Sequence, residues 1–383
     1  MFTRSGRSRE VICRIAVALV GALGCAESAA PKPPPPPPDE IPAPPAPICL
    51  DLEDICAVPL ATYDGSGQVV HPDVAAFRDG FAGHTYWLAA TPYPNGNAGY
   101  ENPSIFTDLA RRWGVPNGLV NPVVPAPGLP AYNSDPDVVY DPDAGALRMY
   151  YRLTSNNEDQ VLMRATTDGV RWTSPVSVAA ASGISIVSPA VVRMPDGRWA
   201  MWSVRAVDGG CLTTATVLER RTSPDGIRWS APVPVDIDQS GYVIWHLDVQ
   251  YVPTKHEFWA LYAAYPVGAG CAADDLFFAR SADGITWRTY SSPIVSRGDF
   301  APFRNAVYRS SFSYDAEHDA VRLFLSGAVH RDDKWIWTTA TSRWRTADLL
   351  AHVGQTGAAA PPADAGPSVW NGATPATAQN EFP

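Results

Sequence analysis

The chain has 383 residues, of which 46% are hydrophobic and 18% are charged, and its formal net charge is −10 at pH 7. Its lysine and arginine residues are dispersed, without the basic stripe that a nucleic-acid-binding protein presents to phosphates. The composition therefore argues against a nucleic-acid partner, and the length allows a globular domain with a substantial core.

The N-terminus predicts an export signal over residues 1–24. Three arginines precede an apolar run from Val11 to Leu23, which is too short to span a membrane. The run ends in Ala-Leu-Gly-Cys, which is similar to a bacterial lipobox, in which the cysteine, here Cys25, receives the lipid. We therefore expect an exported protein. It is either a lipoprotein of the bacterial cell envelope, held at the membrane only by this anchor, or a secreted protein.

Both ends of the chain are predicted to lie outside the main domain. Residues 25–60 read as a linker, because proline dominates positions 31–47 and favours an extended spacer. Cys49 and Cys56 are close enough to close a small disulfide loop in front of the domain. Residues 353–383 are rich in alanine, proline and glycine and are expected to be disordered.

A repeat of roughly 50 to 60 residues fills the stretch 61–352. Its closing signature, Ser/Thr-x-Asp-Gly-x-x-Trp, occurs at Thr166–Trp172, Ser223–Trp229 and Ser281–Trp287. The five opening elements are His71–Val74, Asp135–Val138, Ser188–Val191, His246–Val249 and Arg309–Phe312. Short alternating strands closed by Asp-Gly turns at this period are typical of propeller blades. The sequence thus predicts an all-β fold, a five-bladed β-propeller of four-stranded antiparallel blades, and a monomer.

The tryptophan that ends each closing signature is interpreted as core between blades, placed there by the tight turn before it. Cys211 and Cys271 each follow a glycine in the loop after the second strand of their repeats. Equivalent loops of neighbouring blades can lie side by side, so we predict a Cys211–Cys271 disulfide across blades 3 and 4. No CxxC or HxxxH pair accompanies these cysteines, which argues against a metal site on them.

Functional residues are expected at one end of the propeller, where the starts of the inner strands and the loops between second and third strands converge around a funnel. The strand starts carry His71, Asp73, Asp135, Asp137, His246, Asp248 and Arg309. The loops carry Tyr93–Glu101, Asn156–Asp159, Asp274, Asp275 and His330–Asp333. Ala190 and Ser311 occupy the position of Asp73 in their repeats, so the fold does not require an acid there. The aspartates at this position therefore need another explanation.

The Asp-Pro-x-Val opening, the five repeats, the Asp-Gly-x-x-Trp turns and the export signal together resemble the five-bladed propeller glycoside hydrolases. That group contains the family 43 arabinanases and xylosidases and the family 32 fructosidases. The resemblance implies an enzyme that cleaves a poly- or oligosaccharide with paired carboxylates. One carboxyl must be protonated at the leaving oxygen, and the other must be ionised across the sugar ring.

Asp73 is the nearest match to the first-blade aspartate of that group, which serves as base or nucleophile. The group places its acid before the proline, where this chain has His71, so Asp135 in the second blade fits the pattern better. The glutamate motif of the fourth blade is missing, since that position reads Trp245-His246-Leu247-Asp248. Glu101 and Asp248 are accordingly candidates for the general acid.

His246 is a third candidate for the acid, and we expect His71, Asp137, His246 and Arg309 to bind the substrate. Each of these residues also has a structural interpretation. An aspartate at a strand start often accepts backbone N–H bonds, a histidine can belong to the core, and Arg309 can simply neutralise carboxylates. Clustered acids could also hold a cation such as Ca²⁺ in the channel, although no cofactor is otherwise indicated.

The alternative from another functional class is a non-catalytic surface propeller that binds a carbohydrate or a protein. The missing fourth-blade glutamate favours this alternative, whereas the many funnel acids favour the enzyme. The sequence therefore favours an exported glycoside hydrolase.

Overall fold

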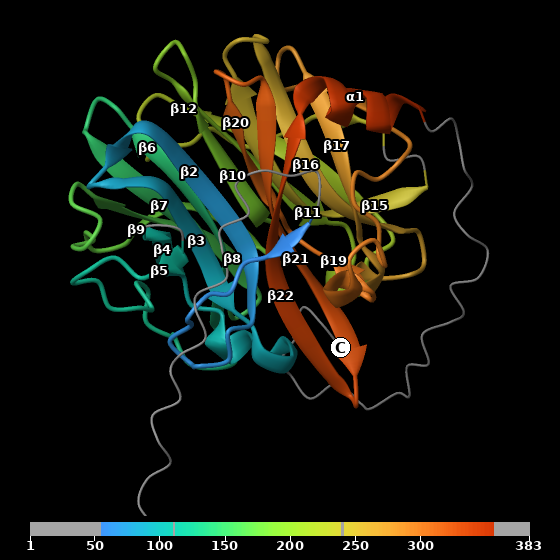
Figure 1. Ribbon diagram of the computed structural model, residues 1–383, viewed down its shortest axis with the longest axis horizontal. Helices are drawn as coiled ribbons and strands as arrows, with labels where there is room; N and C mark the ends of the chain where they lie inside the picture. Colours follow the sequence, from blue (N-terminus) through green and yellow to red (C-terminus); the bar gives the residue numbers. More distant parts are fainter. Residues whose placement is uncertain (1–54, 110–111, 239–240, 356–383) are drawn as a thin grey trace, which may run out of the picture. The chain divides into compact units, whose positions relative to one another are not determined.

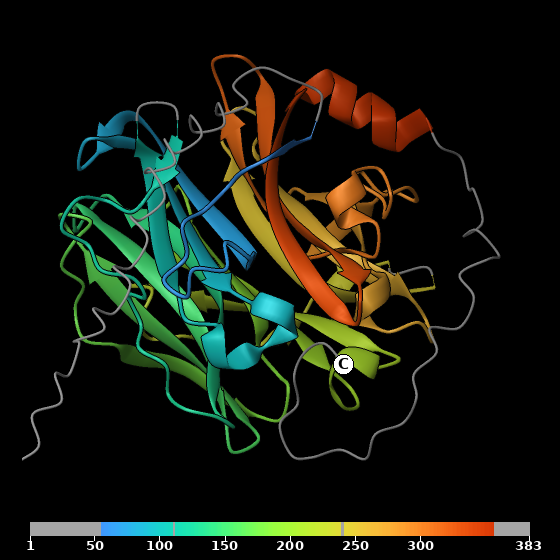
Figure 2. The same cartoon turned by 60° about the horizontal axis from the view of Figure 1, so that its bottom comes forward.

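The computed structural model describes residues 55–109, 112–238 and 241–355, all within one compact unit. In this part of the chain, five small antiparallel sheets stand side by side in a ring (Figure 1; Figure 2). The prediction of a five-bladed β-propeller is thus confirmed. The export signal, Cys25 and Cys49 lie outside the described residues. No helix in the described ranges is long and apolar enough to cross a membrane.

The blades follow one another along the chain. Blade 1 contains β2 (Val69–Phe81), β3 (His84–Pro92), β4 (Ser104–Leu109) and β5 (Arg112–Gly114), with η1 (Pro94–Gly96) and η2 (Ala98–Tyr100) between β3 and β4. Blade 2 contains β6 (Tyr132–Asp141), β7 (Ala146–Ser155), β8 (Glu158–Thr166) and β9 (Val176–Ser182). Blade 3 contains β10 (Val187–Arg193), β11 (Trp199–Ala206), β12 (Thr216–Ser223) and β13 (Val233–Pro234), with η3 (Gly210–Leu212) after β11.

Blades 4 and 5 complete the ring. Blade 4 contains β15 (Tyr242–Val252), β16 (Glu257–Pro266), β17 (Asp275–Ser281) and β18 (Thr286–Thr289), with η4 (Cys271–Ala273) after β16, and β14 (Asp236–Ile237) pairs in parallel with β18. Blade 5 contains η5 (Ala301–Phe303), β19 (Ala306–Val307), β20 (Ser311–Asp315), β21 (Ala320–Arg331), β22 (Lys334–Arg345) and β1 (Cys56–Ala57), and α1 (Thr346–Gln355) follows it.

The N-terminal strand closes the ring. β1 pairs with β22 as the outermost strand of blade 5, and the backbone N–H of Val58 donates to the carbonyl oxygen of Thr339 at 2.7 Å. Val58 and Leu60 are buried. These residues, predicted to be linker, therefore belong to the last blade, because its outer strand offers hydrogen-bonding groups that need a partner.

The C-terminal boundary also differs from the prediction. The helix α1 continues to residue 355, three residues beyond the predicted end of the domain. Leu349 and Val353 are buried in the core cluster of blades 4 and 5. Apolar packing of one helix face thus extends the folded region.

Neighbouring blades meet at the Asp-Gly turns. Each turn glycine packs against an aromatic side chain from the second strand of the preceding blade, as Gly169 does against Trp87. The hydroxyl of Tyr150 donates to the carbonyl oxygen of Gly226 at 2.9 Å, and the indole of Trp202 donates to Gly284 at 2.9 Å. The predicted inter-blade core is therefore built mainly from these second-strand aromatics.

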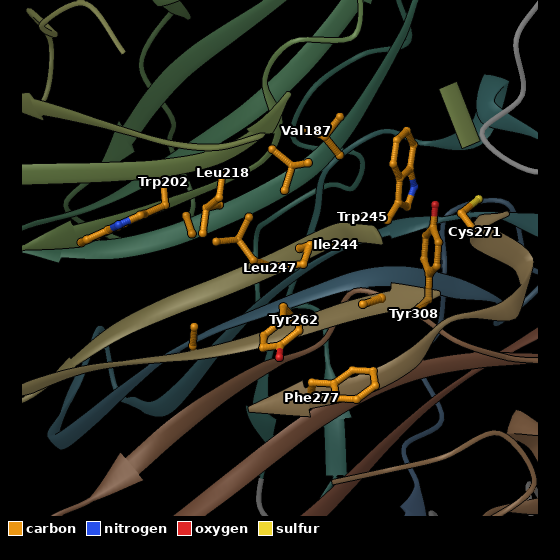
Figure 3. Packing of buried hydrophobic residues seen from close by; sticks show 14 of the residues in the cluster. Val187, Trp202, Leu218, Ile244, Trp245, Leu247, Tyr262, Cys271, Phe277 and Tyr308 are labelled. Carbon is orange, nitrogen blue, oxygen red and sulfur yellow. The ribbon is translucent and has the colours of Figure 1, made fainter. Parts of the chain in front are cut away.

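The signature tryptophans contribute unequally to that core: Trp287 is buried, whereas Trp172 and Trp229 are only half-buried. Figure 3 shows the apolar layer between blades 3 and 4, where Leu218 faces Leu247 and Tyr262 lies beside Phe277. The predicted disulfide is confirmed in the same region. Cys211 in η3 and Cys271 in η4 are bonded, with their Cα atoms 5.0 Å apart.

Candidate active site at the starts of the inner strands

The backbone is irregular where the inner strands begin. The register of the first strand pair shifts in blades 1 to 4, and His71, Asp135 and Ser188 have positive φ angles of 53°, 48° and 49°. Each of these three residues precedes a proline, which cannot donate to the sheet. Bulges and left-handed non-glycine residues concentrate at functional sites, where they re-aim side chains. This local geometry brings repeat-equivalent side chains together.

Four of those side chains form a buried group, the histidine cluster: His71, Asp135, Ser188 and His246. Asp135 Oδ1 lies 3.6 Å from His71 Nε2 and 3.3 Å from His246 Nδ1. The Ser188 hydroxyl lies 3.2 Å from the same carboxylate oxygen and 2.5 Å from His246 Nδ1. The carboxylate of Asp135 is thus the centre of the cluster.

The second carboxylate oxygen of Asp135 binds a buried arginine. Arg152 donates from Nη1 to Asp135 Oδ2 at 3.3 Å and from Nε to Asp159 at 3.1 Å. Burial alone raises the pKa of Asp135, but His71, His246 and Arg152 outweigh it and hold that pKa well below its usual value. The cluster therefore contains an ionised carboxylate.

His71 lies between two carboxylates. Its Nδ1 is 3.2 Å from the Thr91 hydroxyl and 3.5 Å from Glu101, while its Nε2 faces Asp135. Burial, which Asp135 only partly opposes, holds the pKa of His71 well below 6.5. The imidazole is therefore neutral at physiological pH, the form in which histidine binds metals.

A second buried group, the aspartate cluster, lies further along the same strands and consists of Asp73, Asp137 and Asp248. Each carboxylate accepts a hydrogen bond from a backbone N–H of the next blade. The donor is Val138 for Asp73 at 2.7 Å, Val191 for Asp137 at 3.2 Å and Phe312 for Asp248 at 3.3 Å. The third position of the opening element, which is Ala190 or Ser311 in two repeats, thus carries in the other three an aspartate that links its blade to the next.

Arg309 lies beside the aspartate cluster. Its Nη2 lies 3.7 Å from Asp73 and 3.8 Å from Asp137, and its Nη1 donates to the carbonyl oxygen of Pro136 at 2.6 Å. Its side chain is fully buried. Of the two roles considered for Arg309, this position supports the charge neutraliser. Its guanidinium thus places one positive charge among the acids that were considered as holders of a calcium ion.

The pKa values in the aspartate cluster are raised. Burial raises the pKa of Asp73 to about 6, against the opposing effects of Arg309 and the Val138 N–H. Burial and the neighbouring carboxylates raise the pKa of Asp137 and of Asp248 well above the usual value. One guanidinium does not compensate three buried carboxylates, so protons are retained there.

The predicted site residues thus divide into two groups. Asp135, His71, His246 and Glu101 gather at the strand starts, whereas Asp73, Asp137, Asp248 and Arg309 meet deeper in the ring. Asp73, the predicted base or nucleophile, is tied to the second blade. Ser188 and Arg152 were not chosen from the sequence. Ser188 could have been found from its place before a proline, equivalent to His71 and Asp135.

The aspartate cluster also forms the inner end of a cavity of about 600 Å³ at the other ends of the inner strands. Aromatic side chains line its outer part: Phe77, Tyr140, Tyr251 and Tyr314. None of the histidine cluster residues lines this cavity. The two ends of the inner strands therefore present different surroundings.

The histidine cluster has the donor set of a metal site. One ligand atom each from His71, Asp135 and His246 lies within 4.8 Å of the others, and all three side chains are buried. Bonds of about 2.0 to 2.2 Å around one ion place tetrahedral ligands about 3.3 to 3.5 Å apart, close to the two measured contacts of Asp135. Two neutral imidazoles and one ionised carboxylate suit zinc and similar divalent ions.

Comparison with known proteins shows similarity to a protein of Flavonifractor plautii described as an A type blood N-acetyl-alpha-D-galactosamine deacetylase. The two are 30% identical over 294 residues, which cover 65% of this chain and 38% of the relative. This chain therefore spans less than half the length of that relative. No family model matches the chain.

Solved structures show the same fold. The crystal structure of an N-acetylgalactosamine deacetylase from F. plautii in complex with blood group B trisaccharide matches with a TM-score of 0.69 and 26% identity, over 75% of this chain and 92% of that chain. The xylan beta-1,4-xylosidase of Bacillus halodurans C-125 matches with a TM-score of 0.54 and 14% identity, over 72% of this chain and 53% of that chain. The predicted resemblance in fold to propeller glycosidases is therefore confirmed, and a deacetylase has this fold too.

Proposed function

We propose that this protein is a carbohydrate N-deacetylase, which hydrolyses the acetamide group of an N-acetylated amino sugar. The histidine cluster is the observation that carries this proposal, because amide hydrolysis benefits from a polarised carbonyl and an activated water. The similarity to the F. plautii deacetylase over most of the propeller supports the same reaction. The finer choice of N-acetylgalactosamine as the sugar rests on that relative alone.

The fit of the cluster to a divalent cation defines the roles of its members. His71, Asp135 and His246 would hold the ion, which supplies Lewis acidity toward the acetyl oxygen and lowers the pKa of water. Arg152 keeps Asp135 ionised and oriented. Thr91 and Glu101 face Nδ1 of His71 and turn its Nε2 toward Asp135. Such outer partners of metal-binding histidines fix the tautomer and the ring orientation.

The reaction consumes one water for each acetyl group. The water oxygen adds to the acetyl carbon, the carbon–nitrogen bond breaks, and the nitrogen takes up a proton. The products are acetate and the amino sugar, with every glycosidic bond intact. A buried group beside the cluster must carry the proton, and we assign this role to Glu101, which is fully buried next to His71.

Glycoside hydrolysis is the second candidate, and Glu101 with Asp135 would be its carboxylate pair. The observation in its favour is that both carboxyl groups lie at the strand starts, on opposite sides of His71. The originally expected Asp73 is less suitable, since it is bound to the Val138 N–H and faces Arg309. The shared fold with a xylosidase is compatible with this candidate but does not select it.

A product analysis distinguishes these reactions. The purified protein is incubated, with zinc and after treatment with a chelator, with a blood group A oligosaccharide, which ends in N-acetylgalactosamine, and with a xylan and an arabinan. Release of acetate with an intact, amine-bearing glycan supports deacetylation. Release of a sugar supports the glycosidase, and binding without any product supports the non-catalytic alternative.

Variants assign the reaction to the cluster. Asp135→Asn and His246→Ala should abolish acetate release. Asp143→Asn, at an exposed aspartate of the blade 2 turn, is the control that should leave it unchanged. Full activity of Asp135→Asn would contradict the proposed site.

A further inference from the structure

A row of aromatic rings leads away from the histidine cluster. Tyr308 contacts both imidazoles, with ring centroids 4.3 Å from His246 and 5.3 Å from His71. Trp337 follows at 5.3 Å from Tyr308, and Trp335 follows at 6.2 Å from Trp337 with the two indole planes only 26° apart. The row therefore connects the buried cluster with the start of β22.

The outer end of this row lies on a long hairpin. β21 and β22 project beyond the neighbouring strands (Figure 1), and His330 pairs with Trp335 across the hairpin, with ring centroids 4.9 Å apart. Trp337 is buried, Trp335 is half-buried, and His330 is exposed. Burial thus decreases along the row, so Trp335 is the first indole that combines a fixed position with contact to solvent.

The position of Trp335 is fixed by blade 1. Its backbone N–H donates to the side-chain oxygen of Asn95 in η1 at 3.0 Å, and the N–H of Trp337 donates to Gln68 at 3.0 Å. These bonds join residues 240 and 269 positions apart in the sequence. These bonds fix the backbone that carries the indole, and the contacts with Trp337 and His330 orient the ring. The indole is therefore in place before a ligand arrives, which lowers the entropy lost on binding.

The spacing of the row fits a substrate of more than one sugar. Residues two apart on a strand are about 7 Å apart, so Trp335 stands about one sugar ring further from the histidine cluster than Trp337. Flat aromatic rings offer apolar area to the less polar face of a ring-shaped ligand. The exposed charged residues Arg331 to Lys334 at the hairpin tip provide polar groups around it.

We infer that Trp335 is a specificity-determining residue: its indole stacks on the sugar next to the one that reacts, so the enzyme selects oligosaccharides over single N-acetylated sugars. This inference rests on the proposed function, since it takes the histidine cluster as the place of reaction. It adds the chain length of the substrate, which neither the fold nor the comparisons decide.

The test compares two substrates that share the reacting sugar. Acetate release is measured from methyl N-acetyl-α-D-galactosaminide and from a blood group A oligosaccharide, for the wild type, Trp335→Ala and Trp335→Phe. We expect Trp335→Ala to lower kcat/KM on the oligosaccharide about tenfold, mainly through KM, and to change the single-sugar value less than threefold. Trp335→Phe should restore part of the difference, because phenylalanine keeps a ring.

A control and a binding measurement make the outcomes separable. Trp229→Ala removes another half-buried tryptophan, in blade 3 at an Asp-Gly turn, and should leave the ratio of the two kcat/KM values unchanged. An equal loss on both substrates, or no loss on either, overturns the inference. If no variant and no wild-type protein releases acetate, the proposed function fails. Titration calorimetry with the same oligosaccharide then tests Trp335 alone, since Trp335→Ala must still weaken binding about tenfold.

Discussion

The guanidinium of Arg152 and the carboxylate of Asp135 form an ion pair, 3.3 Å from Nη1 to Oδ2, in which neither side chain is exposed. Asp159 fixes the other edge of the guanidinium and accepts two backbone N–H groups, from Ser185 and Ile186. Asp135 is therefore oriented by a chain of buried bonds that begins at the backbone between blades 2 and 3. Such a chain gives the central carboxylate of the histidine cluster one position.

We predict that Arg152→Lys lowers kcat/KM for acetate release about 10- to 100-fold, because a lysine cannot bridge Asp135 and Asp159 with a rigid fork. The positive charge remains, so circular dichroism should show a folded domain. The affinity for added zinc, measured by calorimetry, should fall in parallel. Unchanged zinc affinity together with a lowered melting temperature would mean that Arg152 acts only on stability.

Metal binding should be visible as stabilisation. Added zinc at 100 times its Kd should stabilise the folded state by about 2.7 kcal/mol, provided the unfolded chain does not bind it. A thermal melt should then show a Tm increase of several degrees that is absent in His246→Ala. His256→Asn, at an exposed turn position, is the matched control and should keep the increase. An equal increase in both variants would place the metal elsewhere.

The aspartate cluster predicts that stability falls as the pH rises. The pKa of Asp73 is about 6 in the folded protein, whereas the ordinary pKa of an exposed aspartate is 3.8. The folded state therefore binds this proton more tightly than the unfolded chain does. Stability is therefore lost as the pH rises from about 4 to about 6, by about 3 kcal/mol for a difference of about two pH units. Asp73→Asn, which can still accept from the Val138 N–H, removes this loss.

The measurement is the difference in Tm between Asp73→Asn and the wild type. It should be small at pH 4, grow up to about pH 6 and stay constant above. Asp143→Asn, on the surface, serves as the reference that should show no such growth. A difference that shrinks with pH would mean that Arg309 stabilises the ionised form of Asp73 more than burial destabilises it.

The joint between blades 1 and 2 can be tested at a glycine. A Cβ atom on Gly169 would lie 1.9 Å from the ring of Trp87, and the residue has a φ of +74°. Gly169→Ala should therefore destabilise the domain by about 3 kcal/mol or more, from backbone strain and overpacking together. Gly145→Ala has φ +58° and no atom within 4 Å, so it should show only the backbone cost of about 1 to 2 kcal/mol. Denaturant unfolding that gives equal values for both would contradict the packing explanation.

Local signals in the sequence predicted most of the fold. The Asp-Gly turns fix where strands reverse, and their spacing counts the blades. Cys211 and Cys271 each follow a glycine in the equivalent loop of adjacent repeats. This equivalence was sufficient to predict their disulfide, since equivalent loops of adjacent blades can lie side by side. The pairing of β1 with β22 was not predicted, because a strand of two residues has no alternating pattern of its own. It becomes a strand only by pairing with the outer edge of β22.

The site was predicted only in part. Repeat equivalence brought His71, Asp135, His246 and Asp73 into one list of funnel residues, because a propeller repeats its geometry around an axis. It did not show that these residues form two separate clusters. His71 and Asp73 are two positions apart, but the strand is bulged between them, so their side chains reach different surroundings. The role of Arg152 was hidden, because a buried arginine in a second strand has the same local pattern as an exposed one.

The sequence alone determined the all-β architecture, the number of blades and the ring of polar strand starts, since these follow from short-range turn chemistry repeated at a fixed period. Only the tertiary structure decided which of those polar side chains meet. Asp135 gathers two imidazoles because register shifts at the starts of the inner strands of blades 1 and 4 turn them toward one point. Asp73, in contrast, binds a backbone N–H of the next blade and faces Arg309. Contacts of this kind join residues of different blades, and no local stretch of sequence encodes them.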